Sequence, residues 1–275
     1  MTKKMPEPQY ALADLGDRRV LAVGGREYTT VYSTRVIQML ISFSHMTEYL
    51  AEQPEVAAVT TFDTDATFVA IVRAKVAELG LRRVHEVAHF ENDGTRRLSW
   101  ADGAFDLVVA VGVVEHLPPR NRRAQVDEYY RVLAPGGYIA ILDTPNRWFP
   151  LETHSVGLPL VQWLPPRLAW RYARFCRPDC YGRVPYAEFV ADGTGWRNAT
   201  LADCLPSSGW SGIEDLTEAA RYGWRFFRDT ARSRTRCALL PLFAAGVGLL
   251  RAVGLSPSLC LPYLNLLFRR VPRAG

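Results

Sequence analysis

The run FDLVVAVGVV at residues 105–114 constrains the fold more than any other part of the sequence. An apolar run of this length, without alternating polar residues, is typical of a strand that is buried on both faces, as in a parallel sheet covered by helices. Further β-rich runs lie before and after it, at residues 18–25, 55–62, 82–90 and 138–146. Helical spacing of apolar residues predicts a helix that ends at Gly80 and another that starts near residue 122.

Alternation of strands and helices predicts an α/β fold, a doubly wound, Rossmann-like sheet that is mostly parallel. Ligands of such folds bind beyond the carboxyl ends of the strands. Residues 261–271 predict an antiparallel edge strand, and an aromatic, proline-rich insertion precedes a helical C-terminal segment. We expect an N-terminal segment, a core, a substrate-facing insertion and a sheet-completing segment, at residues 1–17, 18–146, 147–200 and 201–275.

Composition excludes several other classes of protein. The formal charge of +5 over 275 residues comes largely from scattered arginines, which does not indicate nucleic-acid binding. Five cysteines without CxxC or histidine spacing predict no metal site and suggest reduced thiols of a cytoplasmic protein. Since no apolar run follows MTKKMPEPQY, no secretory signal peptide is expected.

The glycine-free stretch RVIQMLISFSHMTEYL at residues 35–50 has two placements. It is either the first strand and turn of the sheet, or the helix that follows a first strand at residues 18–25. Val36, Leu40 and Phe43 fall on one helical face, and strict alternation is absent. The spacing therefore favours the helix.

Residues 98–146, LSWADGAFDLVVAVGVVEHLPPRNRRAQVDEYYRVLAPGGYIAILDTPN, resemble the class I S-adenosylmethionine-dependent methyltransferases, particularly the branch that acts on small molecules and lipid-like acceptors. The F-D-x-V strand, the following E-H-L, the helix that ends R-V-L-x-P-G-G and the next strand recur in this order in that family. The resemblance covers residues 18–146 as a pattern. It implies S-adenosylmethionine as cofactor and methyl transfer to a small-molecule or lipid-like acceptor.

The resemblance also suggests residues that hold the cofactor. Asp63 would accept hydrogen bonds from the ribose hydroxyls, or it would only cap the next helix. Asp93 would contact the adenine amine, although turn chemistry also explains an aspartate beside glycine. The backbone at Val111 and Gly112 would pass beneath the methionine part, or Gly112 would only ease strand packing.

The family's glycine-rich loop is only partly present. Its pattern falls on residues 20–28, where Gly24 matches and Gly25 adds a second flexible residue, but Arg26 and Tyr28 replace two glycines. In one interpretation the loop takes a wider path and Glu27 pairs with the ammonium group of the methionine part. In the other, the protein is a catalytically inactive homologue that acts as a binding or scaffolding partner. Both remain open.

Methyl transfer requires alignment of the acceptor and, for hydroxyl acceptors, removal of a proton. His154 lies in the insertion that would cover the acceptor, and His116 and Glu115 follow the 105–114 strand. All three are candidate catalytic residues, although structural roles explain each of them as well. Aromatic residues of the insertion line an apolar acceptor pocket or simply pack in a core: Trp148, Phe149, Trp163, Trp170 and Tyr172.

The C-terminal third contains a basic stripe followed by the apolar run ALLPLFAAGVGLL at residues 238–250. The arginines at 221, 225, 228, 232 and 236 would share one face if this segment were a single helix. A basic stripe beside an apolar segment is consistent with peripheral contact at the inner membrane surface. A solvated helix face followed by a buried helix is the alternative. Nothing in the sequence indicates the oligomeric state.

Overall fold

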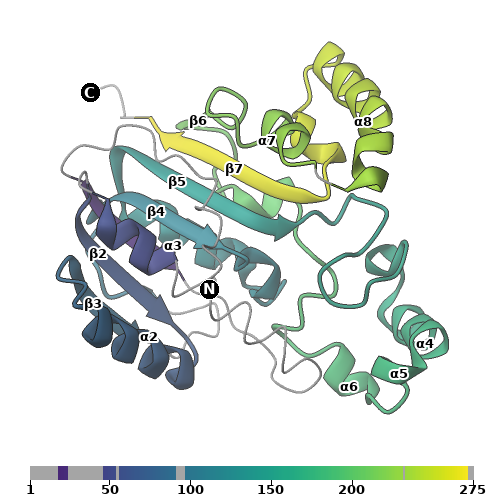
Figure 1. Cartoon of the computed structure of the whole chain (residues 1–275), viewed down its shortest axis with the longest axis horizontal. Coiled ribbons are helices and arrows are strands. Elements are labelled where there is room, and N and C mark those ends of the chain that lie inside the picture. The colour runs from purple at the N-terminus through teal and green to yellow at the C-terminus, as the bar shows by residue number, and fades with distance from the viewer. Residues whose placement is uncertain (1–17, 24–45, 54–55, 91–96, 232, 272–275) are drawn as a thin grey trace, which may run out of the picture.

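The computed structural model describes residues 18–23, 46–53, 56–90, 97–231 and 233–271. Within this part of the chain, seven strands form one sheet in the order β3-β2-β1-β4-β5-β7-β6 (Figure 1). The strands are β1 Arg18–Val23, β2 Val56–Asp63, β3 Val84–His89, β4 Phe105–Val111, β5 Leu133–Pro145, β6 Ile213–Asp215 and β7 Tyr263–Arg270. Strands β1 to β5 pair in parallel, and β7 is antiparallel to both β5 and β6. The predicted doubly wound, mostly parallel α/β sheet is confirmed.

One detail of the sheet differs from the prediction. The segment 261–271 was expected at the edge, but β7 lies between β5 and β6, so the three-residue strand β6 forms the edge. Strand β6 contributes one apolar side chain, that of Ile213. So short a strand gives almost no alternation by which its position could be read from the sequence.

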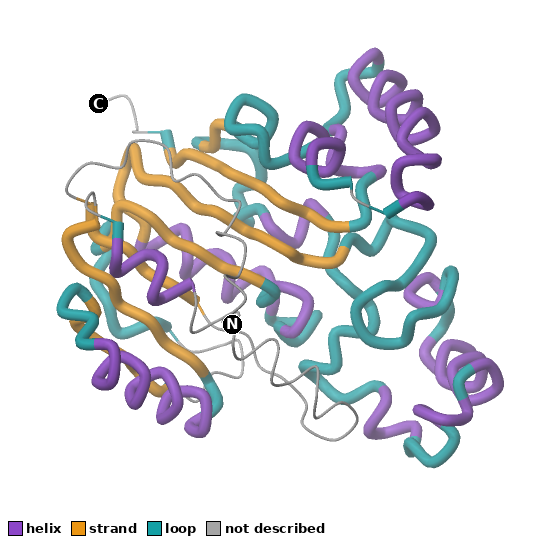
Figure 2. Tube along the Cα trace, in the orientation of Figure 1, coloured by secondary structure: helices purple, strands orange, loops and turns teal. Residues whose placement is uncertain are grey.

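Helices and 3₁₀ turns connect the strands (Figure 2). The helices are α2 Ala66–Leu79, α3 Arg122–Val132, α4 Pro166–Cys176, α5 Pro178–Tyr181, α6 Tyr186–Phe189, α7 Trp224–Asp229 and α8 Arg234–Ala252, and the 3₁₀ helices are η1 Val114–His116, η2 Val161–Trp163, η3 Leu201–Cys204 and η4 Pro257–Cys260. Helix α2 begins at the cap Asp65, whose carboxylate accepts from the Thr67 N–H, and ends at Gly80 with φ +61°. The predicted stop at Gly80 is confirmed.

Residues 46–52 are helical and precede β2. Leu50 is fully buried and belongs to the same core cluster as Val56 and Val59 of β2. The helical placement of 35–50 is thus confirmed over residues 46–50. Residues 35–45 lie outside the described part.

Both faces of β4 are buried, as its continuous apolar sequence requires. Val108 and Ala110 face one core cluster with Tyr129 of α3. Leu107 and Val109 face the other, with Leu50. Because side chains alternate along a strand, this division places helical layers on both faces of the sheet.

The Pro-Gly-Gly segment was expected to stop a helix, but it is part of β5. Helix α3 ends at Val132, and Leu133 is already the first residue of the strand. A Cβ on Gly137 would lie 2.8 Å from the Asp106 carbonyl oxygen of β4. Glycine is required here because the two backbones approach so closely.

The insertion forms a lobe with its own apolar core, around α4, α5 and α6 at the lower right of Figure 1. Trp170 and Tyr172 pack against this core. Phe149 instead stacks on Phe243 of α8, and Trp148 is 56% exposed. These aromatic residues therefore lie in different surroundings and do not share one pocket.

The C-terminal arginines do not form one stripe, because the single helix on which that stripe depended is not present in the described part of the chain. Arg221 lies in a turn with φ +64°, α7 ends at Asp229, and α8 starts only at Arg234. Ser233 caps α8 by accepting the N–H of Arg236. The predicted stripe was therefore wrong, and the apolar segment stands alone as helix α8.

Candidate functional site

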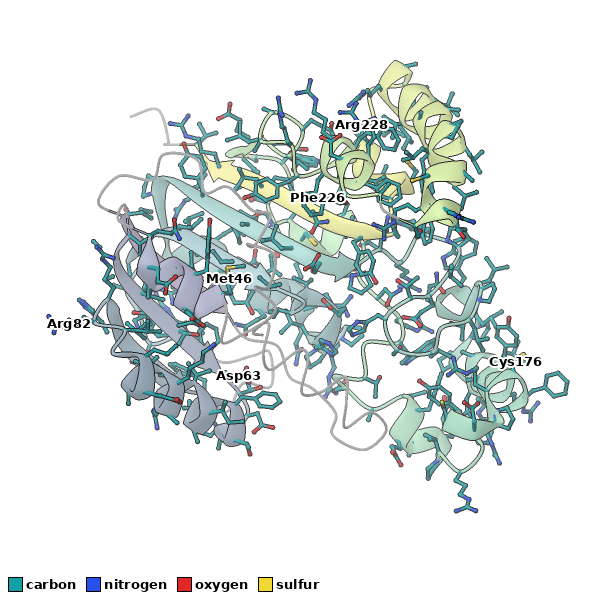
Figure 3. All side chains as sticks on the ribbon, viewed as in Figure 1. Met46, Asp63, Arg82, Cys176, Phe226 and Arg228 are labelled. Carbon is teal, nitrogen blue, oxygen red and sulfur yellow. The ribbon has the colours of Figure 1, made fainter. Side chains whose placement is uncertain are left out.

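The candidate site lies beyond the carboxyl ends of β2, β4 and β5. Asp63 is the last residue of β2, and Figure 3 shows it at the tip of that strand. Glu115 and His116 belong to η1, directly after β4. The loop after β5 carries His154. Parallel strands place these three segments on the same edge of the sheet.

Asp63 is 8% exposed, and its Oδ1 accepts the backbone N–H of Asp65 at 2.9 Å. It does not cap α2, because Asp65 does so. Burial raises the pKa of the Asp63 carboxyl to about 7, partly opposed by the N–H groups of Asp65 and Thr64. A carboxylate that is buried at a strand end without capping a helix is available to bind a ligand with hydroxyl groups.

The backbone turns sharply after β4. Gly112 has φ +60°, a conformation that strongly favours glycine, and its N–H donates to the Leu142 carbonyl of β5 at 2.9 Å. The chain passes directly from Val111 through this turn into η1. Gly112 thus directs the chain from the strand end towards Glu115 and His116.

Four candidate residues lie outside the described part of the chain: Gly24, Gly25, Glu27 and Asp93. Their cofactor roles remain predictions.

Two histidines from segments far apart in the sequence meet at the site. The Nε2 atoms of His116 and His154 lie 3.1 Å apart, with the rings at 66°. His116 Nδ1 lies 2.7 Å from the Gly193 carbonyl oxygen and donates to it, so its Nε2 is the acceptor in neutral imidazole. Burial, followed by the charge of His154, lowers the pKa of His116 to about 3.

Glu115 adds a carboxylate to the two histidines. Its Oε1 lies 4.0 Å from His116 Nε2, and its side chain is fully buried. Neither carboxylate oxygen has a hydrogen-bond partner in the described structure, because the backbone N–H of Glu115 itself and the nearby Thr144 hydroxyl do not reach bonding geometry. Burial raises the pKa of Glu115 to about 8, and its own backbone N–H and then the positive charge of Arg122 oppose this rise only in part.

Glu152 fixes the loop that carries His154. It is fully buried, and each of its carboxylate oxygens accepts two backbone N–H groups. Oε1 accepts from His154 at 2.7 Å and Ser155 at 2.9 Å, and Oε2 from Val156 at 2.6 Å and Gly157 at 2.8 Å. Four charge-assisted bonds hold the turn and thereby place the imidazole of His154.

Arg122, the first residue of α3, ties the surrounding segments together. It is 4% exposed and donates to the backbone carbonyls of Glu115, Leu117 and Asn198 and to the carboxylate of Asp203. Its donors are thus engaged with backbone oxygens and Asp203. They are not bonded to the Glu115 carboxylate.

Gly195 lies against the rings of both histidines. It has φ +70°, and a Cβ there would lie 3.1 Å from His154 Cδ2 and 3.2 Å from His116 Cε1. A cavity of about 140 Å³ lies beside it, lined by residues of the insertion such as Gly193 and Trp196 and by four residues that precede the insertion: Glu115, Leu117, Pro119 and Arg122. This volume is smaller than the ~300 Å³ of the smallest usual ligand pockets, so it suits a few waters or a small polar group.

The structure thus brings together Glu115, His116 and His154, which were predicted separately. Glu152, Arg122 and Gly195 were not predicted. The sequence offered a weak signal for Glu152, an acid just before a Thr-His-Ser-Val-Gly turn, but none for Arg122 because the RNRR segment resembles a solvated surface.

Residues 41–141 match the model of a family described as "Methyltransferase domain". A similar curated protein is the 2-methyl-6-phytyl-1,4-hydroquinone methyltransferase of a Synechocystis species, with 30% identity over 173 residues. That match covers 60% of this chain and 51% of the relative, so the chain spans about half the relative's length.

Solved structures give weaker similarity. A S-adenosylmethionine-dependent methyltransferase from Aquifex aeolicus matches with 21% identity and a TM-score of 0.35, over 58% of this chain and 73% of that one. The YcgJ protein from Bacillus subtilis matches with 14% identity and a TM-score of 0.40, over 94% of each chain.

Proposed function

The chain contains a class I S-adenosylmethionine-dependent methyltransferase domain, and from this premise we propose that it transfers a methyl group to a small-molecule or lipid-like acceptor. The observation that carries the proposal is the arrangement of Asp63 and the Glu115–His116–His154 cluster along one edge of the sheet. The Asp63 carboxylate suits the ribose of the cofactor, and the Glu115–His116–His154 cluster suits a polar acceptor.

The residues at this edge fit S-adenosylmethionine. When bound, that cofactor supplies an activated methyl group on a sulfonium. Asp63 would hold the ribose hydroxyls through its buried carboxylate. The backbone of Val111 and Gly112 would lie against the methionine part, since Gly112 has no Cβ at the turn. Gly24, Gly25, Glu27 and Asp93, which lie outside the described residues, remain proposed contacts of the cofactor.

We infer the class of acceptor from the cluster and from the similar curated protein. That relative is named for a hydroquinone with a phytyl chain, a polar ring on an apolar tail. In this chain the cluster would contact the polar group of the acceptor, with His154 foremost because it is the least buried member. The insertion of residues 147–200 carries His154 and Gly195 and would face the acceptor.

Binding of S-adenosylhomocysteine, measured by calorimetry, tests the proposal. We expect binding to the wild-type chain and, in Asp63→Ala, an affinity that is weaker by about 1–3 kcal/mol through loss of charged hydrogen bonds. Asp65→Ala is the matched control, since it removes a neighbouring carboxylate that only caps α2. No binding at millimolar ligand would instead support a cofactor-free homologue that acts as a binding or scaffolding partner.

We also propose that the protein is cytoplasmic and contacts the inner membrane surface through α8. This helix has 19 residues, is long and apolar enough to cross a membrane, and only 6% of its most apolar 18 residues are buried. Its outer face includes Leu242 at 70% exposure and Leu249 at 67%. Length and composition would also suit a membrane span, but Val247 of α8 packs with Trp224 and Phe227 of α7, which favours a helix that lies on the surface.

The charge of α8 favours an anionic bilayer as its partner. The helix contains three arginines and no acidic residue, and of the three Arg251 pairs with Glu218 at 2.8 Å. Figure 1 places it at the outer end of the molecule, beside α7, where Figure 3 also shows the side chain of Arg228. A helix with exposed apolar side chains and arginines near its ends binds anionic membranes through apolar burial and charge together.

Co-sedimentation with vesicles of phosphatidylglycerol and phosphatidylcholine tests this contact. We expect binding that weakens as salt is raised, and loss of binding in Leu242→Glu/Leu249→Glu. The matched control is Leu79→Glu, at an apolar residue that is 46% exposed on α2, away from α8. Indifference to vesicles, or dimerisation through α8 in its place, would refute the membrane contact.

A further inference from the structure

We propose that Glu115, His116 and His154 form a binding site for a divalent transition-metal ion. The sequence predicted no metal site, a prediction drawn from the spacing of the cysteines. Of the three residues here, two are adjacent and the third follows 38 positions later, which is no familiar ligand spacing. The fold brings one potential ligand atom of each to within 4.8 Å of the others.

The distances between these atoms suit one shared ion. Zinc binds histidine nitrogen at about 2.0–2.1 Å, so two such nitrogens lie about 3.0 Å apart at a right angle and about 3.4 Å apart in a tetrahedron. The two Nε2 atoms are 3.1 Å apart, within this range. Glu115 Oε1 is 4.0 Å from His116 Nε2, so the carboxylate would have to approach by about 0.6–1 Å to reach the same range.

The unpartnered carboxylate of Glu115 is the second, independent observation. Its side chain is fully buried, and neither oxygen has a hydrogen-bond partner among the described residues. A buried carboxyl without partners is costly, and a cation is the group that would satisfy it. Arg122 cannot do so in this arrangement, because it donates to backbone oxygens and to Asp203.

Neighbouring residues fix the positions of His116 and His154, as the neighbours of metal ligands commonly do. His116 donates its other ring N–H to the Gly193 carbonyl, which fixes the tautomer that leaves Nε2 for a metal. Glu152 fixes the backbone of His154. The absence of a Cβ at Gly195 leaves room beside both rings. Contacts of this kind, between a metal ligand and its neighbours, orient the ligand, and their loss commonly weakens metal affinity by about 10–100-fold.

Two imidazoles and one carboxylate select a borderline transition metal such as Zn²⁺, Co²⁺ or Mn²⁺ over Mg²⁺. Three protein ligands leave a coordination position for water or for an oxygen of another molecule. The adjacent cavity of about 140 Å³ would contain it. If the proposed methyl transfer holds, the ion would bind the acceptor's oxygen and lower the pKa of its hydroxyl.

Titration of the untagged, metal-free chain with Co²⁺ at pH 8, followed by visible absorption and calorimetry, tests the site. We expect one tightly bound ion per chain, displaced by Zn²⁺ and not by Mg²⁺. In His154→Asn and Glu115→Gln, Co²⁺ affinity should fall at least about 100-fold, since a lost ligand costs more than a lost contact between a ligand and its neighbour. The matched control, His85→Asn, removes an exposed histidine and should leave binding unchanged.

Unchanged Co²⁺ binding in both cluster variants, or no stoichiometric binding to the wild-type chain, would overturn the metal site. Glu115→Gln keeps the shape of the buried side chain. If Glu115→Gln does not fold, His154→Asn alone tests the site. S-adenosylhomocysteine binding, measured on the same samples, separates the two proposals. It should persist in His154→Asn, so loss of metal binding alone leaves the methyltransferase proposal standing.

Discussion

The carboxylate of Glu152 should control both the stability of the protein and the position of His154. Glu152→Gln is the most informative change, because it keeps the size of a fully buried side chain and removes its charge. Of the four backbone N–H groups that the carboxylate accepts, at 2.6–2.9 Å, two would meet the amide nitrogen, which is itself a donor.

The magnitude follows from those contacts. Hydrogen bonds to a charged group contribute about 1.5–3 kcal/mol each. The two hydrogen bonds that the amide oxygen in Glu152→Gln would still accept are weaker, because that oxygen carries no full charge. The turn is partly exposed and can relax towards water, so the sum is an upper limit. We expect the free energy of unfolding to fall by about 2–4 kcal/mol and the melting temperature by roughly 5–10 °C.

Thermal unfolding followed by circular dichroism measures the change. Glu188→Gln, in the short helix α6, is the matched control at a residue with no such set of contacts and should shift the melting temperature little. Co²⁺ affinity measured on the same variant reports the position of His154 and should fall about 10–100-fold. A melting temperature within about 1 °C of wild type would refute this account of Glu152.

Three further predictions follow from other parts of the molecule. Since the folded-state pKa of Asp63 is raised from 3.8 to about 7, the ionised carboxylate disfavours folding above pH 7, and this cost disappears below about pH 4. Asp63→Asn should therefore raise the free energy of unfolding by about 2–4 kcal/mol at pH 8 but not at pH 4. Urea denaturation at the two pH values measures this difference. Equal effects at both pH values would contradict the prediction. Wild-type affinity for S-adenosylhomocysteine should increase from pH 6 to pH 8, because the ionised form accepts the ribose hydrogen bonds, and a calorimetric affinity independent of pH would exclude this coupling. Gly195→Ala should weaken Co²⁺ binding, since its Cβ would lie 3.1–3.3 Å from the two histidine rings, whereas Gly209→Ala, with φ +64° and nothing within 4 Å, adds comparable backbone strain and should leave Co²⁺ binding intact.

The sheet was predictable because each of its parallel strands has a local signature. The continuous apolar run of β4 and the helical spacing that ends at Gly80 both reflect burial, which is periodic in the sequence. The order at the C-terminal edge was not predictable in full. Strand β6 has three residues, and its place outside β7 depends on long-range pairing.

The site was predictable by residue type but not by arrangement. His116 and Glu115 stand out after the β4 strand, and His154 stands out in the insertion, yet nothing local says that their side chains meet. That contact depends on Gly193 and Gly195, about 40 residues beyond His154, and on a loop held by Glu152. The broken helix between α7 and α8 was missed because arginine spacing alone cannot reveal a turn.

The position of β7 has a consequence for the order of folding. Strands β1 to β5 are complete by residue 145, but the free edge of β5 is covered only when Tyr263–Arg270 pairs with it. During synthesis the long edge of β5 therefore stays open while more than a hundred further residues emerge. An unpaired edge of this length is a template for pairing with other chains. Chains cut short before β7 are thus expected to aggregate, even though every residue of the candidate site is present.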